Sequence, residues 1–431
     1  MHGPRRRPRP GGCPSIDWRE RMGEHMAERR RALIVGAGVA GMSAAIRMEE
    51  AGWEPVIVER KPSRRMAGYM VGMFAEGVVA AERLGVRDGI GSRDRADRVT
   101  LQLDADGTRR PGPGLADQPG APEAVLRSDI EAALWKRMGD RIEVRFGLEP
   151  LGIEQDADAA HVTLRTVATG ETHRESFDLV VGADGVRSAV RTLVLDPEGR
   201  SVKPMPAVVC AFQARGQMPG FAEHESVIVS EPKRAMWVFA LAGTTPTVMM
   251  SYRTRKAGKD LQGSAADAMR RTFAGLSAGG VVEDALAELD AAEATLFDSV
   301  EQIRLPSWHR GRVVVIGDAA WCLTLFSGMG ATSGLLGGTA LGDALVAHPD
   351  DIEAALTAFE AEMRPFVVKH QRTAAIKSQL FVPSGRITWW IRRRLLASKR
   401  FRVMGVGAPR EAKGKAAVAP AASVEETAPA A

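Results

Sequence analysis

The stretch Arg31-Ala-Leu-Ile-Val-Gly36-Ala-Gly38-Val-Ala-Gly41 combines an apolar run with the spacing G-x-G-x-x-G, and an alanine-rich segment follows it. This order predicts a buried strand, a tight turn and a helix, as in a Rossmann-type βαβ unit. Gly36 permits the turn, Gly38 lets a pyrophosphate approach the backbone, and Gly41 lets the helix pack closely on the strand. The start of the helix offers free backbone N–H groups to phosphates. The stretch therefore predicts a dinucleotide site, whose further candidate contacts are Ala37, Val39 and Ala40.

A second apolar strand, Glu54-Pro-Val-Ile-Val-Glu59, ends in an acidic residue. An acidic side chain at this distance after the glycines accepts hydrogen bonds from an adenosine ribose. Arg60 follows directly and is a candidate contact to the edge of the adenosine. FAD and NAD share all of these features, so this part of the chain leaves the choice between them open.

Two later segments repeat the order of buried strand, glycine turn and helix. In the first, Leu-Val-Val-Gly-Ala leads to Asp184-Gly185, and the helix that follows is predicted to be capped near Ser188. In the second, Val-Val-Val-Ile leads to Gly317-Asp318. A carboxylate at this turn can hold the ribityl hydroxyls of a flavin, so both segments favour FAD as the cofactor.

Together, the glycine fingerprint, the D-G segment and the G-D segment resemble the FAD-dependent aromatic (class A) flavoprotein monooxygenases of the para-hydroxybenzoate hydroxylase fold, over roughly residues 30–370. The resemblance implies that Arg127, in the segment Leu-Arg-Ser-Asp-Ile, reaches the phosphates or the ribityl chain of the flavin. It also implies that the loop of Gly328, Met329 and Gly330 lies against the isoalloxazine ring. The positive end of the helix that starts there would favour the anionic reduced flavin.

Two positions depart from the pattern of this family. Leu325 stands where a proline is usual, and Trp321 stands where a histidine is common. The fold does not depend on either residue, so these departures concern only the detailed geometry over the flavin ring.

The predicted fold class is α/β, with a Rossmann-type FAD-binding domain interleaved with a mixed-sheet substrate domain and followed by C-terminal helices. Residues 142–146 are predicted to open an antiparallel meander that ends in the strand of the D-G segment. The N-terminal segment is rich in Arg, Pro and Gly, the C-terminal tail has almost no large apolar residues, and both are predicted to be disordered. The assigned ranges are 31–96, 119–203 and 301–368 for the FAD-binding domain, 97–118 and 204–300 for the substrate domain, 369–405 for the C-terminal helices, and 1–30 and 406–431 for the disordered ends.

Composition supports a soluble protein. The chain has 431 residues, of which 45% are hydrophobic and 26% charged, as in ordinary globular proteins of more than one domain. Its three widely separated cysteines, Cys13, Cys210 and Cys322, suggest neither a disulfide framework nor a metal site, and a cytoplasmic location fits them. No apolar run approaches the length of a membrane span, and no nucleic-acid-binding module is recognised.

The resemblance implies that NADPH or NADH reduces FAD, that O2 adds at flavin C4a, and that the hydroperoxide passes one oxygen to an aromatic or polyketide-like small molecule. No second Rossmann fingerprint is present, so NAD(P)H is expected to bind transiently. The cofactor carries the chemistry, and the sequence identifies no catalytic side chain and no metal cluster. The choice of NADH or NADPH and the oligomeric state stay open.

Two other functional interpretations of the sequence remain open. A flavin oxidoreductase of the same fold would reduce or dehydrogenate its substrate, and a non-catalytic scaffold would bind no flavin. The halogenase signature W-x-W-x-I-P is absent.

Two further segments have alternative interpretations. The Trp/Arg-rich segment 388–402 either lies on an anionic membrane or packs on the protein with solvated arginines. The predicted strands around residues 235–250 provide either core packing or an apolar substrate pocket, through Met236, Trp237, Phe239, Met249 and Met250.

Overall fold

The computed structural model describes residues 29–64, 68–114 and 120–397. The segments predicted to be disordered lie outside these ranges, apart from residues 29–30, and so do residues 398–405 of the predicted C-terminal helices.

A six-stranded sheet carries the glycine fingerprint. Its central strand β1 pairs in parallel with β2 and β11, β18 continues the parallel order, and β17 is antiparallel to β18. Nearly all side chains of β1, β11 and β18 are buried, as expected for parallel strands covered on both faces. In spatial order the strands are β17 (His309–Arg310), β18 (Val313–Val315), β11 (Leu179–Gly182), β1 (Arg31–Val35), β2 (Glu54–Glu59) and β7 (Glu143–Phe146).

The position of β7 corrects one prediction. Residues 142–146 do not belong to the antiparallel meander, because β7 pairs in parallel with β2, with Ile57 opposite Val144. Helix α5 (Arg127–Met138) precedes β7 and provides the crossover that a parallel neighbour requires. The meander itself is a separate three-stranded sheet of β8 (Leu148–Gln155), β9 (Ala160–Thr166) and β10 (Thr172–Phe177). Contrary to the prediction, the D-G strand β11 is not its last strand, because β11 pairs in parallel with β1 and β18.

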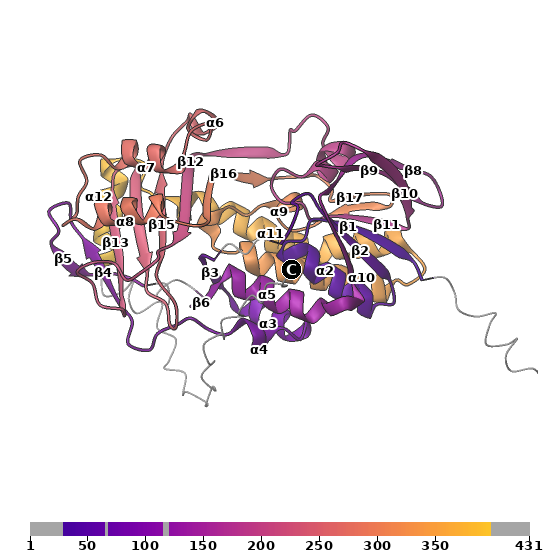
Figure 1. Cartoon of the computed structure of the whole chain (residues 1–431), viewed down its shortest axis with the longest axis horizontal. Helices are drawn as coiled ribbons and strands as arrows, with labels where there is room; N and C mark the ends of the chain where they lie inside the picture. Colours follow the sequence, from indigo (N-terminus) through magenta and orange to yellow (C-terminus); the bar gives the residue numbers. More distant parts are fainter. Residues whose placement is uncertain (1–28, 65–67, 115–119, 398–431) are drawn as a thin grey trace, which may run out of the picture.

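A seven-stranded mixed sheet forms the other end of the molecule (Figure 1). Its strands are antiparallel to their neighbours except β4, which pairs in parallel with β13. Helices α7 (Ala265–Phe273) and α8 (Val281–Asp290) share a hydrophobic core with this sheet. In spatial order the strands are β16 (Thr295–Ile303), β12 (Val202–Gln213), β15 (Thr247–Tyr252), β14 (Arg234–Phe239), β13 (Glu225–Glu231), β4 (Val99–Leu103) and β5 (Arg109–Pro111).

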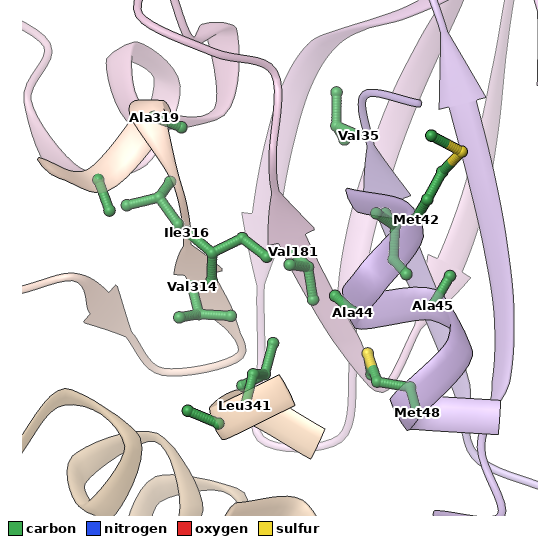
Figure 2. Packing of buried hydrophobic residues seen from close by; sticks show 14 of the residues in the cluster. Val35, Met42, Ala44, Ala45, Met48, Val181, Val314, Ile316, Ala319 and Leu341 are labelled. Atoms are coloured by element: carbon green, nitrogen blue, oxygen red, sulfur yellow. The ribbon is translucent and has the colours of Figure 1, made fainter. Parts of the chain in front are cut away.

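Helices α2 (Val39–Glu50) and α10 (Gly330–Ala347) cover the six-stranded sheet and pack unusually closely on each other. A Cβ atom at Gly338 would lie 2.5 Å from the Ala44 nitrogen, and one at Gly342 would lie 2.3 Å from the Arg47 Cβ. Figure 2 shows Met42, Ala44 and Met48 of α2 and Leu341 of α10 in one core, which also contains Val181 and Val314. Small residues on both helices therefore let the two backbones approach each other.

Two C-terminal helices, α11 (Ile352–Phe381) and α12 (Arg386–Ala397), follow α10. Helix α11 is continuous across the boundary at residue 368 that the sequence predicted. Helix α12 packs on the seven-stranded sheet, because the Trp389 indole N–H donates to the Ser230 carbonyl at 2.7 Å and Arg393 pairs with Asp104 at 3.2 Å. Within the described ranges, no helix has the length and apolar character that would let it cross a membrane.

The remaining elements are short. They are the β3 (Met70–Met73) and β6 (Glu123–Leu126) ribbon, α3 (Ala75–Arg83), α4 (Arg87–Ile90), α6 (Ala257–Asp260), α9 (Asp318–Trp321), and the single turns η2 (Gly139–Arg141), η3 (Arg191–Leu195) and η4 (Leu325–Ser327).

Candidate functional site

The glycine loop between β1 and α2 has the geometry that its sequence predicts. Gly36 has a φ of +107°, and a Cβ atom there would lie 2.6 Å from the Ala183 carbonyl oxygen. A Cβ atom at Gly41 would lie 2.0 Å from the Gly36 carbonyl oxygen, so only glycine lets the helix start this close to the strand. A Cβ atom at Gly38 would meet no atom within 4 Å. The backbone at Gly38 therefore borders open space at the start of α2.

Glu59, at the end of β2, lies beside this loop. Its carboxylate accepts hydrogen bonds from the backbone N–H groups of Ala37 at 3.1 Å and Lys61 at 3.0 Å. The two bonds orient the Glu59 side chain next to the glycine turn, where it remains half-buried. Arg60 is exposed directly after the strand.

The D-G turn packs directly against the glycine loop, through the contact of Ala183 with Gly36. The Asp184 carboxylate accepts hydrogen bonds from the Ser188 hydroxyl at 2.5 Å and from the backbone N–H groups of Ala189 at 2.6 Å and Val190 at 3.2 Å. Ser188 in turn accepts from the Arg191 N–H at 2.9 Å, which agrees with the predicted cap. Burial raises the pKa of Asp184 despite these bonds.

Arg191, which sequence reasoning missed, connects the D-G and G-D segments. Its guanidinium donates to the Ala319 carbonyl at 2.9 Å and to the Val186 carbonyl at 2.7 Å, and the residue is only 3% exposed. Burial lowers the pKa of Arg191. An arginine in an otherwise apolar stretch was the available signal, but one of its two partners, Ala319 in helix α9, lies 128 residues away in the sequence.

Asp318 lines an internal recess. Its side chain is exposed to solvent, yet the protein surrounds it so closely that desolvation raises the pKa of its carboxyl. A carboxyl group that is both accessible and closely surrounded faces an enclosed space rather than the outer surface. The N-cap of α9 is Gly317, and Asp318 forms part of its first turn. The positive charge of Arg127 acts on Asp318 in the opposite direction to burial and favours the ionised form.

Arg127 reaches this recess from the start of α5. Its guanidinium donates to the Tyr69 hydroxyl at 2.7 Å and to the Glu131 carboxylate at 3.0 Å. Tyr69, followed by Glu131, raises the pKa of Arg127, so its positive charge is permanent. These bonds hold the arginine in place while 38% of its side chain stays exposed.

The loop between α9 and α10 contains a strained residue. Thr324 has a φ of +73°, which is unusual for a β-branched side chain. The Ser327 hydroxyl donates to the Thr324 carbonyl at 2.7 Å and accepts from the Met329 N–H at 3.1 Å. Met329 is buried below the loop, whereas Gly330 is exposed at the first turn of α10. The first N–H groups of α10 have no partner within the helix.

The two residues that depart from the family pattern both take structural positions. Trp321 is fully buried and packs on Trp308 and Phe359, with ring centroids 4.6 Å and 6.2 Å apart. Leu325 packs against the cluster that includes Phe326 and Trp237. Neither residue is the solvent-facing polar group that a reacting side chain would be.

A cavity of about 200 Å³ lies between the seven-stranded sheet, the β3–β6 ribbon and the C-terminal helices. Trp237 and Phe239 line this cavity, in agreement with the interpretation of these strands as the wall of an apolar pocket. Met236 and Met250 instead face the opposite side of the sheet and belong to its core with α7 and α8. The cavity borders the loop before α10, because its lining residue Phe74 contacts Gly328.

The identity of the family follows from comparison with known proteins. A family model described as an FAD binding domain matches residues 29–374. The chain belongs to this FAD-binding family. The flavoprotein resembles the FAD-dependent urate hydroxylase of Mycolicibacterium vanbaalenii, with 28% identity over 77% of this chain and 83% of the relative. It also resembles the FAD-dependent monooxygenase asL4 of Sarocladium schorii, with 25% identity over 89% of this chain and 96% of the relative.

A solved structure has a similar fold. The Klebsiella pneumoniae HpxO structure, complexed with FAD and uric acid, superimposes with a TM-score of 0.67 at 20% identity, covering 87% of this chain and 96% of HpxO. The predicted resemblance to FAD-dependent monooxygenases, the α/β fold class and the FAD cofactor are thus confirmed, and the flavoprotein is an oxidoreductase.

The residues present fit FAD. The open space beside Gly38, the carboxylate of Glu59 next to the loop, and the accessible but enclosed Asp318 lie on three segments that meet at the first turn of α2. Gly317 belongs to this meeting point, since a Cβ atom there would lie 2.8 Å from the Ala40 Cβ. Among the residues that the structure describes, no cluster of His, Cys, Asp or Glu could hold a metal ion.

Proposed function

We propose that this flavoprotein hydroxylates an aromatic or polyketide-like small molecule in the cytoplasm, with FAD, O2 and NADH or NADPH. The observation that carries the proposal is the convergence of three distant motifs on the first turn of α2. The D-G turn contacts Gly36, the G-D turn contacts Ala40, and the start of α10 approaches Val39. A largely apolar cavity lies beside the loop before α10.

Each motif has a proposed role toward FAD. Backbone groups of the glycine loop, from Gly36 to Gly41, would hold the pyrophosphate at the positive end of α2. Glu59 would accept hydrogen bonds from the ribose, and the exposed Arg60 would lie at the edge of the adenosine. The sites proposed for the rest of the flavin are Arg127, Asp184, Gly317, Asp318, Gly328, Met329 and Gly330.

Arg127 and Asp318 would act together on the middle of the cofactor. Asp318 accepts hydrogen bonds from hydroxyl groups in its ionised form, and the permanent charge of Arg127 favours that form. Arg127 is itself held by Tyr69 and Glu131, so it requires little reorganisation to meet a phosphate or hydroxyl group. The Arg127 side chain is therefore oriented before any cofactor binds.

Bound FAD would supply the redox chemistry and the activation of oxygen. The chain would orient the substrate and exclude water. The first backbone N–H groups of α10, which begins at the exposed Gly330, form the positive end of this helix and would favour negative charge on the nearest part of the flavin. Trp237, Phe239 and Phe381 would surround the substrate with apolar surface, which suits a planar ligand.

The test begins with the FAD-loaded enzyme under anaerobic conditions. NADH and NADPH are each mixed with it, with and without a panel of phenolic and polycyclic substrates, and flavin reduction is followed by the loss of absorbance at about 450 nm. Oxygen is then admitted and the products are analysed by mass spectrometry. A gain of one oxygen atom supports hydroxylation. A change of two hydrogens without oxygen would instead identify a reductase or dehydrogenase, and a protein that binds no flavin would refute both.

A further inference from the structure

The cavity beside the loop before α10 contains more positive charge than its apolar walls suggest. Arg98, Lys377 and Arg392 line it, and no aspartate or glutamate is present among its lining residues in the described chain. Arg98 is neutralised by Asp94, at 3.1 Å. For Lys377 and Arg392, no ion pair with a described carboxylate is formed within 4 Å.

Arg392 is the more unusual of the two cations. The residue is 3% exposed, and its Nε donates to the Leu380 carbonyl at 2.5 Å. Its Nη1 atom is buried and has no hydrogen-bond partner among the residues that the structure describes. Burial lowers the pKa of Arg392 to about 10, so the side chain is still charged at neutral pH. The arginines of this segment are therefore not all solvated, contrary to one of the two interpretations of the sequence.

Lys377 lies on the neighbouring helix α11 and faces the same cavity. Its ammonium group donates to the Ser327 carbonyl at 3.1 Å, in the loop before α10. Burial and the nearby Lys369 lower the pKa of Lys377. An ammonium group has three donors, and the carbonyl of Ser327 uses one of them.

A buried cation without a counter-ion is costly, because desolvation is not offset by an opposite charge. The buried Arg392 and the half-buried Lys377, both lining the same largely apolar cavity, are explained if a ligand supplies the negative charge. The aromatic surface of the cavity indicates the remainder of that ligand: Trp237 and Phe381 pack with ring centroids 5.4 Å apart, and Phe381 also packs on Phe326 of η4. The loop before α10 is therefore in contact with both the aromatic wall and Lys377.

We infer that the substrate is a planar aromatic compound carrying a carboxylate, and that Arg392 of the C-terminal helix α12 binds this carboxylate with the help of Lys377. The inference rests on the proposed function and specifies its substrate class. An arginine with a free Nη1 donor suits a carboxylate oxygen, and hydrogen bonds between charged groups are the strongest in proteins. Helix α12 would thus act as a specificity element as well as a structural cover.

The test uses pairs of ligands with the same ring and different charge. Benzoate and benzamide, 2-naphthoate and 2-naphthamide, and anthracene-2-carboxylate and its amide are titrated into the FAD-loaded protein by isothermal calorimetry at pH 7. At least one carboxylate is expected to bind about 10- to 150-fold more tightly than its amide. Arg392→Gln should reduce this preference to nearly one. Arg386→Gln, an exposed position on the same helix, is the control and should leave it unchanged.

Two results would overturn the inference. One is that no carboxylate in the panel binds more tightly than its amide to the unaltered protein, a comparison that needs no variant to fold. The other is a carboxylate preference that persists in a folded Arg392→Gln protein. Flavin content and anaerobic reduction by NAD(P)H are recorded on the same samples. Their failure would refute the proposed function, whereas normal reduction without a carboxylate preference would refute only the substrate class.

Discussion

Two alanine substitutions in the glycine fingerprint should separate the packing of the fold from the binding of FAD. Gly41→Ala places a Cβ atom 2.0 Å from the Gly36 carbonyl oxygen, a backbone atom that cannot rotate away. The strand and helix must then move apart, and such overpacking costs roughly 1–3 kcal/mol of unfolding free energy. Gly38→Ala meets no atom within 4 Å and has a φ of −84°, which alanine adopts readily.

The unfolding free energy of the flavin-free Gly38→Ala protein should therefore lie within about 1 kcal/mol of that of the unaltered protein. Its FAD affinity should nevertheless fall, because the new methyl group occupies the space through which the pyrophosphate approaches the backbone. A hydrogen bond to a charged group is worth about 1.5–3 kcal/mol, so the loss of one such bond should weaken FAD binding by about 10- to 150-fold. Urea denaturation of the flavin-free proteins and fluorescence titration with FAD measure the two quantities. An unchanged FAD dissociation constant for Gly38→Ala would show that the pyrophosphate does not lie at this loop, and an unchanged unfolding free energy for Gly41→Ala would refute the packing argument.

Three other substitutions probe the remainder of the site. Asp318→Ala should weaken FAD binding about 10- to 150-fold in a fluorescence titration. Because burial raises the pKa of Asp318 in the folded protein, its ionised form lowers stability at neutral pH. At pH 7 the melting temperature of the flavin-free variant should therefore be no lower than that of the unaltered protein. The difference between the two melting temperatures should vanish as the pH falls below the ordinary pKa range of aspartate. A lower melting temperature of the variant at pH 7 would contradict this reasoning. Arg191→Met should lose roughly 2–4 kcal/mol in urea denaturation, since two carbonyl groups lose their donor, and a loss below 1 kcal/mol would exclude this connecting role. Burial raises the pKa of the Cys322 thiol, and it raises the pKa of the Cys210 thiol to about 12. A Cys13→Ser protein, which retains only these two thiols, should therefore not react rapidly with a thiol reagent at pH 8 until it is denatured. Rapid labelling of the native protein would show that one of the two thiols is accessible.

The sequence alone was sufficient to predict the cofactor and the centre of the fold. Short-range patterns carry this information: the apolar strand before Gly36, the spacing of the three glycines, and the acidic end of the next strand lie within thirty residues of one another. Each of the D-G and G-D turns is equally local. The backbone conformation that each turn requires is set by its own residues, so it can be predicted without knowing what packs against it.

The sequence was less informative about pairing between distant segments. Residues 142–146 form a short, half-buried strand whose pattern does not distinguish an antiparallel meander from a parallel edge. Only the position of α5 and the free edge of β2 decide that β7 joins the six-stranded sheet. The packing of α10 on α2 through Gly338 and Gly342 is likewise invisible locally, because a glycine within a helix is unfavourable until a second backbone lies against it.

The chemistry around the site also depends on tertiary contacts. Asp318 and Arg127 are almost two hundred residues apart, yet one charge acts on the other in the folded protein. Trp237 and Met236 are neighbours in the chain, but alternation along β14 directs them to opposite faces of the sheet, so only the first lines the cavity. Arg392 resembles its solvent-facing neighbours in composition, and only the packing of α12 on the sheet buries it beside that cavity. Local sequence thus predicted the FAD cofactor and the turns at Gly36, Asp184 and Gly317, whereas the placement of charge around the apolar cavity was decided by long-range packing.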